Sequence, residues 1–123
     1  MMEKSYYIEY EDRGDYLYVL VGGEKLTAEI SKIYWREIAH KAFNLKKLKI
    51  LIEKDFKESV SPPEMLEMGN YLGYLLPTFT IAFVDRFSHD DVNQLGKMVA
   101  RHREVIMQLF DSVENAERWL RVN

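Results

Sequence analysis

Two aspartates that follow apolar runs are the first candidates for chemistry in this sequence. Asp55 ends the stretch Lys49–Asp55, and Asp85 ends the stretch Phe79–Asp85. If these runs are neighbouring parallel strands, both carboxylates emerge at the sheet edge where open α/β sheets bind ligands. Such a pair could hold Mg²⁺ or share a proton. Acidic residues at strand ends are more often helix caps, however, so we expect neither a catalytic nor a metal site.

The other reactive side chains form no recognisable catalytic or metal-binding pattern. His40, His89 and His102 lack the spacing of metal ligands, and the sequence contains no cysteine. Gly22-Gly23 does not fit the pattern of a phosphate-binding loop. No serine, histidine and aspartate fall in a hydrolase signature. These absences leave no positive case for catalysis, and we expect no cofactor.

Two serines lie between Asp55 and the next predicted helix and are candidate phosphorylation sites. Ser61-Pro62-Pro63-Glu64 has the pattern of a capping box, with a serine N-cap, a proline in the first helical position and a glutamate at the third. Capping explains Ser61, although a phosphate at a helix N-terminus is well tolerated. Ser59 is less constrained by this pattern and is the better candidate for modification.

The helix that follows Ser61 is apolar around most of its circumference. Its apolar residues are Met65, Leu66, Met68, Tyr71, Leu72, Tyr74, Leu75 and Leu76. Such a helix buries two faces, one on a sheet and one against another helix, a second copy of the chain or a partner. Methionine and tyrosine are frequent in protein interfaces, and a methionine-containing groove also suits an apolar ligand. The predicted docking residues are Asp55, Ser59, Ser61, Met65, Met68, Tyr71 and Tyr74.

Hydrophobic periodicity and turn residues predict the elements that position these side chains. The predicted strands are Tyr6–Glu11, Tyr16–Val21, Lys49–Asp55, Phe79–Asp85 and Val105–Phe110. Helices are predicted at Ala28–Asn44 with Thr27 as N-cap, from Ser61 to Pro77, after Ser88 and after Ser112. Periodicity alone leaves open whether Val105–Phe110 is a strand or continues the preceding helix.

This order predicts an α/β fold. It predicts a single mixed β-sheet with an N-terminal antiparallel hairpin, parallel βαβ crossovers and about four helices. The hairpin turns at Asp12-Arg13-Gly14-Asp15, and Gly22-Gly23 is expected to end the second strand. Gly69 and Gly73 weaken their helix, which indicates that this face approaches another backbone closely. Trp35 is expected to flank the core.

The composition fits one soluble globular domain over residues 1–123. Of these 123 residues 47% are hydrophobic and 30% are charged. A net charge of −3 gives no reason to expect nucleic acid or an anionic membrane as a partner. The absence of cysteine fits a reducing compartment, and no apolar run reaches the length of a membrane span. We expect a cytoplasmic protein with no integral membrane association.

The order of elements and three segments resemble the STAS domain (sulfate transporter and anti-sigma factor antagonist), in particular its SpoIIAA-like branch of small stand-alone proteins. The segments are Lys46–Asp55, Phe79–Asp85 and Leu109–Leu120. The last of these resembles the family's ending of phenylalanine, aspartate, alanine and then tryptophan-leucine. The resemblance spans nearly the whole chain and favours a strand at Val105–Phe110. It concerns mainly packing residues.

What the resemblance implies is a binding module, not an enzyme, that acts through protein contacts. In the family, a serine at the start of the helix after the central strand is phosphorylated, and the added charge blocks docking. The family's aspartate-serine-serine-glycine motif is absent, since Phe56-Lys57-Glu58 follows Asp55, and the nearby hydroxyls are those of Ser59 and Ser61. The branch is also related in fold to Sec14-type lipid carriers.

We therefore expect a regulatory or protein-interaction module that docks through the surface around the central strand-to-helix junction and the helix that follows. The expected partner is another protein or a second copy of the chain, as in a homodimer. The alternative is a protein that binds a small apolar ligand or a lipid.

Overall fold

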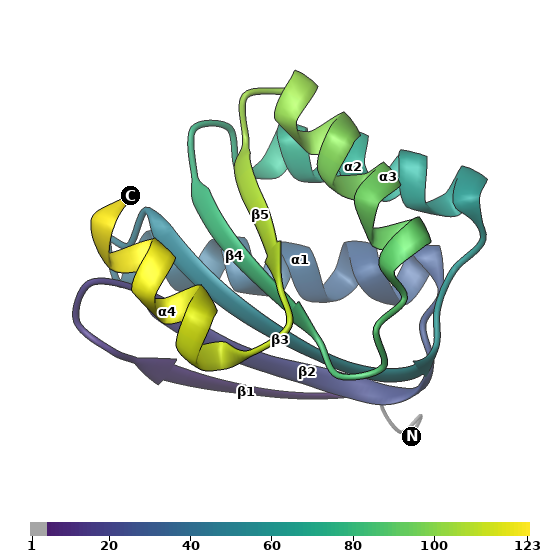
Figure 1. Ribbon diagram of the computed structural model, residues 1–123, viewed down its shortest axis with the longest axis horizontal. Coiled ribbons are helices and arrows are strands. Elements are labelled where there is room, and N and C mark those ends of the chain that lie inside the picture. The colour runs from purple at the N-terminus through teal and green to yellow at the C-terminus, as the bar shows by residue number, and fades with distance from the viewer. Residues whose placement is uncertain (1–4) are drawn as a thin grey trace.

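The computed structural model describes residues 5–123, which form one five-stranded sheet with helices on both faces (Figure 1). The strands are β1 (Tyr7–Asp12), β2 (Leu17–Lys25), β3 (Lys49–Glu58), β4 (Thr80–Asp85) and β5 (Ile106–Phe110). The helices are α1 (Ala28–Asn44), α2 (Pro62–Leu75), α3 (Asp90–His102) and α4 (Val113–Val122). The strands lie in chain order; β1 is antiparallel to β2, and the other pairs are parallel. The predicted α/β fold is confirmed, including the strand at the start of the C-terminal segment.

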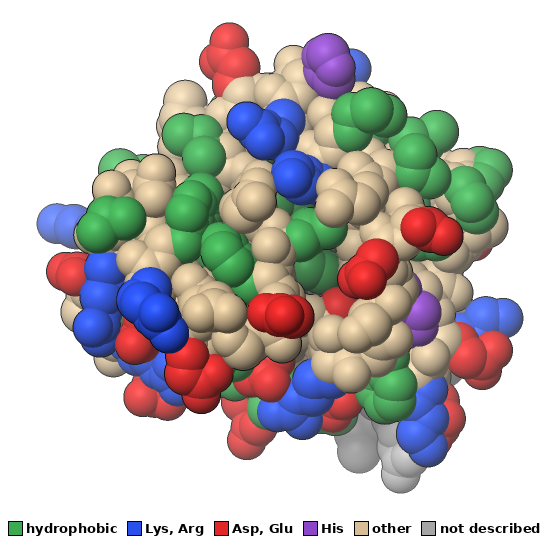
Figure 2. Space-filling view, viewed as in Figure 1, with side chains coloured by type: hydrophobic (Ala, Val, Ile, Leu, Met, Phe, Trp, Pro, Cys, Tyr) green, Lys and Arg blue, Asp and Glu red, His purple; other side chains and the backbone are tan. Residues whose placement is uncertain are grey.

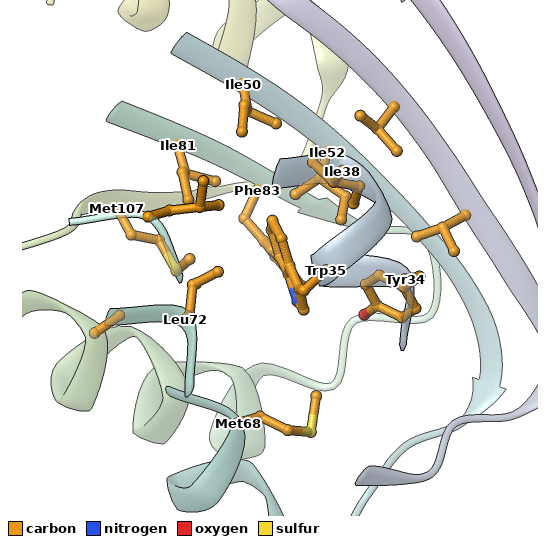
Figure 3. Close-up of a cluster of buried hydrophobic side chains, with 14 of the residues drawn as sticks. Tyr34, Trp35, Ile38, Ile50, Ile52, Met68, Leu72, Ile81, Phe83 and Met107 are labelled. Carbon is orange, nitrogen blue, oxygen red and sulfur yellow. The ribbon is translucent and has the colours of Figure 1, made fainter. Parts of the chain in front are cut away.

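Each face of the sheet packs on its own hydrophobic core. The larger core lies under α1, α2 and α3, and its buried side chains include Tyr34, Trp35, Ile38, Ile50, Ile52, Met68, Leu72, Ile81, Phe83 and Met107 (Figure 3). The smaller core lies under α4 and contains Tyr16, Leu51, Ala82, Val84, Ala116 and Leu120. Side chains alternate along a strand, so β3 sends Ile50 and Ile52 to one core and Leu51 to the other. Trp35 is a core residue, as predicted.

Three of the four helices begin at the capping residue that the sequence predicts. Thr27 accepts a hydrogen bond from the Ile30 amide at 3.1 Å, and Ser112 accepts one from the Asn115 amide at 3.2 Å. At the start of α2, the Ser61 hydroxyl accepts from the Glu64 amide, and the Glu64 carboxylate accepts from the Ser61 amide at 3.2 Å. The predicted capping box is therefore present.

The fourth helix, α3, begins differently from the prediction. Ser88 does not cap it, and the N-cap residue His89 makes no side-chain capping hydrogen bond. The Asp85 carboxylate takes that place, because it accepts hydrogen bonds from the amides of Phe87 at 2.9 Å and His89 at 3.3 Å. Ser88 itself has a φ of 53°, in the left-handed region.

Two strands are longer than predicted. Gly22-Gly23 does not end β2, which continues to Lys25, and β3 continues past Asp55 to Glu58. A Cβ on Gly22 would lie 2.5 Å from the carbonyl oxygen of Asp55 and 2.7 Å from its Cβ. The glycine therefore allows close pairing of β2 with β3 instead of stopping the strand. The connection from β3 to α2 shrinks to residues 59–61.

The glycines of α2 do permit a close helix contact, as predicted. A Cβ on Gly69 would lie 2.9 Å from the carbonyl oxygen of Gly96 and 2.9 Å from Cβ of Val99. A Cβ on Gly73 would lie 2.2 Å from Cβ of Arg103. The contact brings α3 against α2 and so closes the larger core at the side of β5.

Candidate functional site

A lysine is buried in the centre of the sheet. Lys54 stands between Ile52 and Phe56 on the face of β3 that the larger core covers, and it is 1% exposed. Its ammonium nitrogen lies 3.3 Å from the side-chain oxygen of Asn93 and 4.0 Å from a carboxylate oxygen of Asp85. Lysine is almost never fully buried unless it is paired, so this side chain is a candidate for function.

The carboxylate of Asp85, the register partner of Lys54 on β4, has its own donors. Besides the amides of Phe87 and His89, the side-chain nitrogen of Asn93 donates to it at 2.8 Å, and Nδ1 of His89 lies 2.8 Å from the same oxygen. Burial by itself raises the pKa of Asp85, but the hydrogen bond from Asn93 and the charge of Lys54 outweigh burial, so the pKa lies below its usual value. The carboxylate is thus ionised at neutral pH.

Burial governs the proton equilibrium of Lys54. Removal of the ammonium from water lowers the pKa of Lys54 to about 8, although the negative charge of Asp85 opposes this effect. The oxygen of Asp85 at 4.0 Å is beyond hydrogen-bond distance. An ammonium has three donors, and residues 5–123 supply one acceptor, on Asn93. The ring of Phe83 adds a cation–π contact, with its centre 5.2 Å from the ammonium nitrogen.

Lys54 lines a cavity of about 40 Å³ between the sheet and the helices. Its wall is mainly apolar and includes Tyr34, Trp35, Met65, Met68, Leu72, Phe83, Met107 and Leu109. In Figure 3 the ring of Trp35 stands between Phe83 and Tyr34 and faces Met68 and Leu72. Apart from Lys54, the charged or amide side chains of the wall are those of Asn93 and Lys97.

A surface cleft of about 340 Å³ adjoins this cavity and shares Phe83, Asn93 and Leu109 with it. The cleft lies at the carboxyl ends of β4 and β5, where parallel sheets usually bind ligands. Asp90 and Asp111 are among its residues. Figure 2 shows a hollow on the face that carries α3 and β5, with hydrophobic side chains at its floor and acidic and basic side chains around it.

The two aspartates that first suggested chemistry do not meet. Lys54 and Asp85 are register partners and point to the same face, so Asp55, the next residue on β3, points to the opposite face. There the Tyr7 hydroxyl donates to Asp55, and Arg86 lies 3.3 Å from it. Within residues 5–123, no three histidine, aspartate or glutamate side chains are grouped to hold a metal ion.

The predicted docking residues are divided among different places. Met65 and Met68 are buried and line the Lys54 cavity, whereas Asp55 lies on the other face of the sheet. Ser61 is exposed, but the hydroxyl of Ser59 is buried and has no hydrogen-bond partner in the described part of the chain. Accessibility therefore favours Ser61 as a modification site, the reverse of the sequence-based ranking. Phosphorylation of either serine stays a prediction.

The outer face of α2 carries an aromatic surface. Tyr74 is 80% exposed, and its ring stacks on that of Tyr71 with centroids 6.3 Å apart. Leu66 is also exposed on this helix. Lys32 of α1 forms an ion pair with Glu67 and lies 5.8 Å from the centre of the Tyr71 ring. We call Ser61, Leu66, Tyr71 and Tyr74 the α2 outer surface.

Neither Lys54 nor Asn93 is among the site residues predicted from the sequence. A signal for Lys54 existed, because Ile52 and Phe56 stand two residues to either side and alternation places all three side chains on one face. Asn93 carries no comparable signal. Its role depends on how α3 is oriented against β4.

Comparisons with known proteins establish the fold. No protein-family model matches the sequence, no curated protein matches it, and no described helix is long and apolar enough to cross a membrane. An anti-sigma factor antagonist from Mycobacterium paratuberculosis matches the structure with a TM-score of 0.62 over 95% of each chain, at 12% identity. An uncharacterised protein of the DUF3478 family from Shewanella loihica, with a SpoIIAA-like fold, matches with a TM-score of 0.56 over 98% of each chain, at 18% identity. The chain therefore has the SpoIIAA-like fold that its sequence resembles.

Proposed function

We propose that this chain is a non-enzymatic regulatory or interaction module of one domain that docks on a protein partner or on a second copy of itself. Its fold matches that of an anti-sigma factor antagonist. The name of that protein describes a protein that acts against another protein. A cytoplasmic location fits the absence of cysteine.

The α2 outer surface is the docking site in this proposal, and the exposure of Tyr74 is the observation that carries it. The stacked pair of Tyr71 and Tyr74, with the Tyr74 ring 80% exposed, gives the outer side of α2 a continuous aromatic contact area. Tyrosine supplies a large, rigid contact area at interfaces. Met65 and Met68 belong to the support beneath this surface, since both are buried.

The substitution Tyr74→Asp tests the proposal. Val122→Asp on α4 is the matched control, because Val122 is 83% exposed and α4 lies on the opposite face of the sheet. We expect Tyr74→Asp to abolish self-association in sedimentation equilibrium, or capture of a chemically crosslinked partner, while Val122→Asp behaves as wild type. Both variants should keep the circular dichroism spectrum. The proposal would be contradicted if the wild type were a monomer at all concentrations and the Tyr74→Asp variant still captured the same partner.

Lipid binding is the weaker candidate. Ligand pockets for drug-sized molecules measure roughly 300 to 1,000 Å³, and the cavity beneath α2 measures about 40 Å³. The adjoining cleft is larger, but acidic side chains such as Asp90 and Asp111 line it. An apolar ligand that co-purifies with the protein in native mass spectrometry would reverse this ranking.

A further inference from the structure

The exposed residues of α3 all lie on one stripe along the outer side of this helix. At about 100° per residue, their positions cover about 120° of the helix circumference. We call them the α3 stripe: Asp90, Asp91, Gln94, Met98, Arg101 and His102. The stripe faces solvent from the first residue of the helix to the last.

The charges of the α3 stripe are separated along the helix, with acidic residues at its start and basic residues at its end. On the face shown in Figure 2, basic side chains and a histidine lie toward the top and acidic side chains lie lower down, over the two ends of α3. The helix dipole favours this order. The charged side chains of the stripe nevertheless form no ion pair and no hydrogen bond within residues 5–123. Their charges are available to another molecule.

A surface hollow of about 350 Å³ follows the basic half of the stripe. Its lining includes Lys97 and Arg101, which lie four residues apart on the helix. Like charges at this spacing destabilise a helix. Neither side chain has an acidic partner within residues 5–123. An acidic group that entered the hollow would therefore relieve the repulsion between them.

The positions of the α3 stripe are symmetric about Gly96. Three of its residues lie six, five and two positions before this glycine, and three lie two, five and six positions after it. Two antiparallel copies of α3, related by a two-fold axis at this position, therefore bring the stripes into register. Asp90 and Asp91 of each copy then lie beside Arg101 and His102 of the other, and both contacts occur twice.

We propose that two copies of this chain pair through their α3 stripes, with the helices antiparallel. Charge complementarity sets the orientation, because a parallel pair would place acidic ends together and basic ends together. Met98 is 52% exposed and packs beside Gln94 of the other copy in this arrangement. A helix of 13 residues is about 20 Å long, so one helix pair covers less than the roughly 800 Å² per partner of a standard interface. The dimer is therefore weak and sensitive to salt.

This pairing goes beyond the docking proposed for the α2 outer surface. Tyr74 belongs to α2 and lies outside the α3 stripe. If copies pair through α3, Tyr74→Asp leaves the dimer intact and acts on the capture of a different partner. If Tyr74→Asp dissociates the dimer and substitutions in the α3 stripe do not, copies pair through the α2 outer surface. That result would overturn the inference and leave the proposed function standing.

Sedimentation equilibrium of the full chain at concentrations up to about 1 mM tests the pairing. We expect a reversible equilibrium between monomer and dimer at about 20 mM sodium chloride. At about 500 mM the dissociation constant should be at least about tenfold higher, because salt screens exposed charges. A wild type that stays monomeric at low salt would overturn the proposal.

Two charge variants test the complementarity. The double variant Arg101→Glu, His102→Glu has an acidic stripe, and Asp90→Lys, Asp91→Lys has a basic one. Each variant alone should dimerise at least about tenfold more weakly than wild type, because like charges then meet. An equimolar mixture should form dimers of one copy of each, which native mass spectrometry distinguishes by mass. A mixture without such dimers would overturn the proposal.

A matched control separates the stripe from a general effect of charge. Arg118 is exposed on α4, which packs on the opposite face of the sheet. Arg118→Glu changes the charge by the same amount as Arg101→Glu alone, yet it should dimerise as wild type does. Equal weakening by these two substitutions would contradict pairing through α3. Melting curves show that each variant is folded.

Discussion

Replacement of Lys54 by methionine should make the protein more stable at neutral pH. The side chain is 1% exposed, and its pKa falls from the ordinary 10.5 to about 8. At about 1.4 kcal/mol per pH unit, this fall corresponds to about 3 kcal/mol of unfavourable free energy in the charged native state. The lost hydrogen bond to Asn93 offsets about 1 kcal/mol of the gain. The free energy of unfolding should therefore rise by about 2 kcal/mol.

The gain should change with pH in a defined direction. Below the native pKa of about 8, Lys54 is charged in both the native and the unfolded chain, and the full penalty is present. Between about 8 and 10.5 the native state loses this proton while the unfolded chain keeps it, so the wild type becomes more stable as pH rises. Methionine does not titrate. The difference between variant and wild type should shrink across this window.

Urea unfolding followed by circular dichroism, at a series of pH values from about 7 to 11, measures this difference. Lys57→Met is the matched control and should change stability by less than about 0.5 kcal/mol, because its ion pair with Glu24 is exposed. A Lys54→Met variant less stable than wild type at neutral pH, or a difference independent of pH, would refute the reasoning.

Substitutions of Gly69, Ser61 and Leu120, the last two with a control variant each, test the packing and the caps by thermal or urea unfolding. Gly69→Ala should lower the free energy of unfolding by about 1 to 3 kcal/mol, because its Cβ would press on the Gly96 carbonyl; a net gain, which helix propensity alone predicts, would contradict the close contact. Ser61→Ala should lower the free energy of unfolding by about 1 kcal/mol, and Ser61→Asp should lower it much less, because aspartate also caps a helix. Equal decreases for the two variants would argue against the capping role. Leu120→Ala should lower the free energy of unfolding by about 2 to 4 kcal/mol, because it removes packing from the core under α4. Val122 is exposed, so Val122→Ala should change this free energy little.

Local sequence signals predicted the elements and most of their caps. Thr27, Ser61 and Ser112 each accept from the amide three residues ahead, so the information lies within one helical turn. Ser88 shows the limit of this reasoning. The cap it could have formed is made by Asp85, whose carboxylate reaches the same amides from the end of β4.

The candidate site could be predicted from the sequence only in part, for a different reason. Lys54 becomes unusual only because α1, α2 and α3 cover its face of the sheet and because Asn93 and Asp85 approach it from other elements. Alternation gives the face of a strand residue but does not tell whether a helix covers that face. Asp55 illustrates the same ambiguity, since it lies one residue away and has a side chain on the opposite face.

The strands occupy the sheet in the order in which they follow one another in the chain. During translation, each strand can thus pair with the one made just before it, and the sheet grows at one edge. Helix α4 departs from this local order, because the hydroxyl of Tyr16, the residue before β2, donates to Glu117 near the other end of the described chain. A nascent chain that has not yet released α4 leaves Leu51, Ala82 and Val84 uncovered by that helix, and exposed apolar surface of this kind favours aggregation.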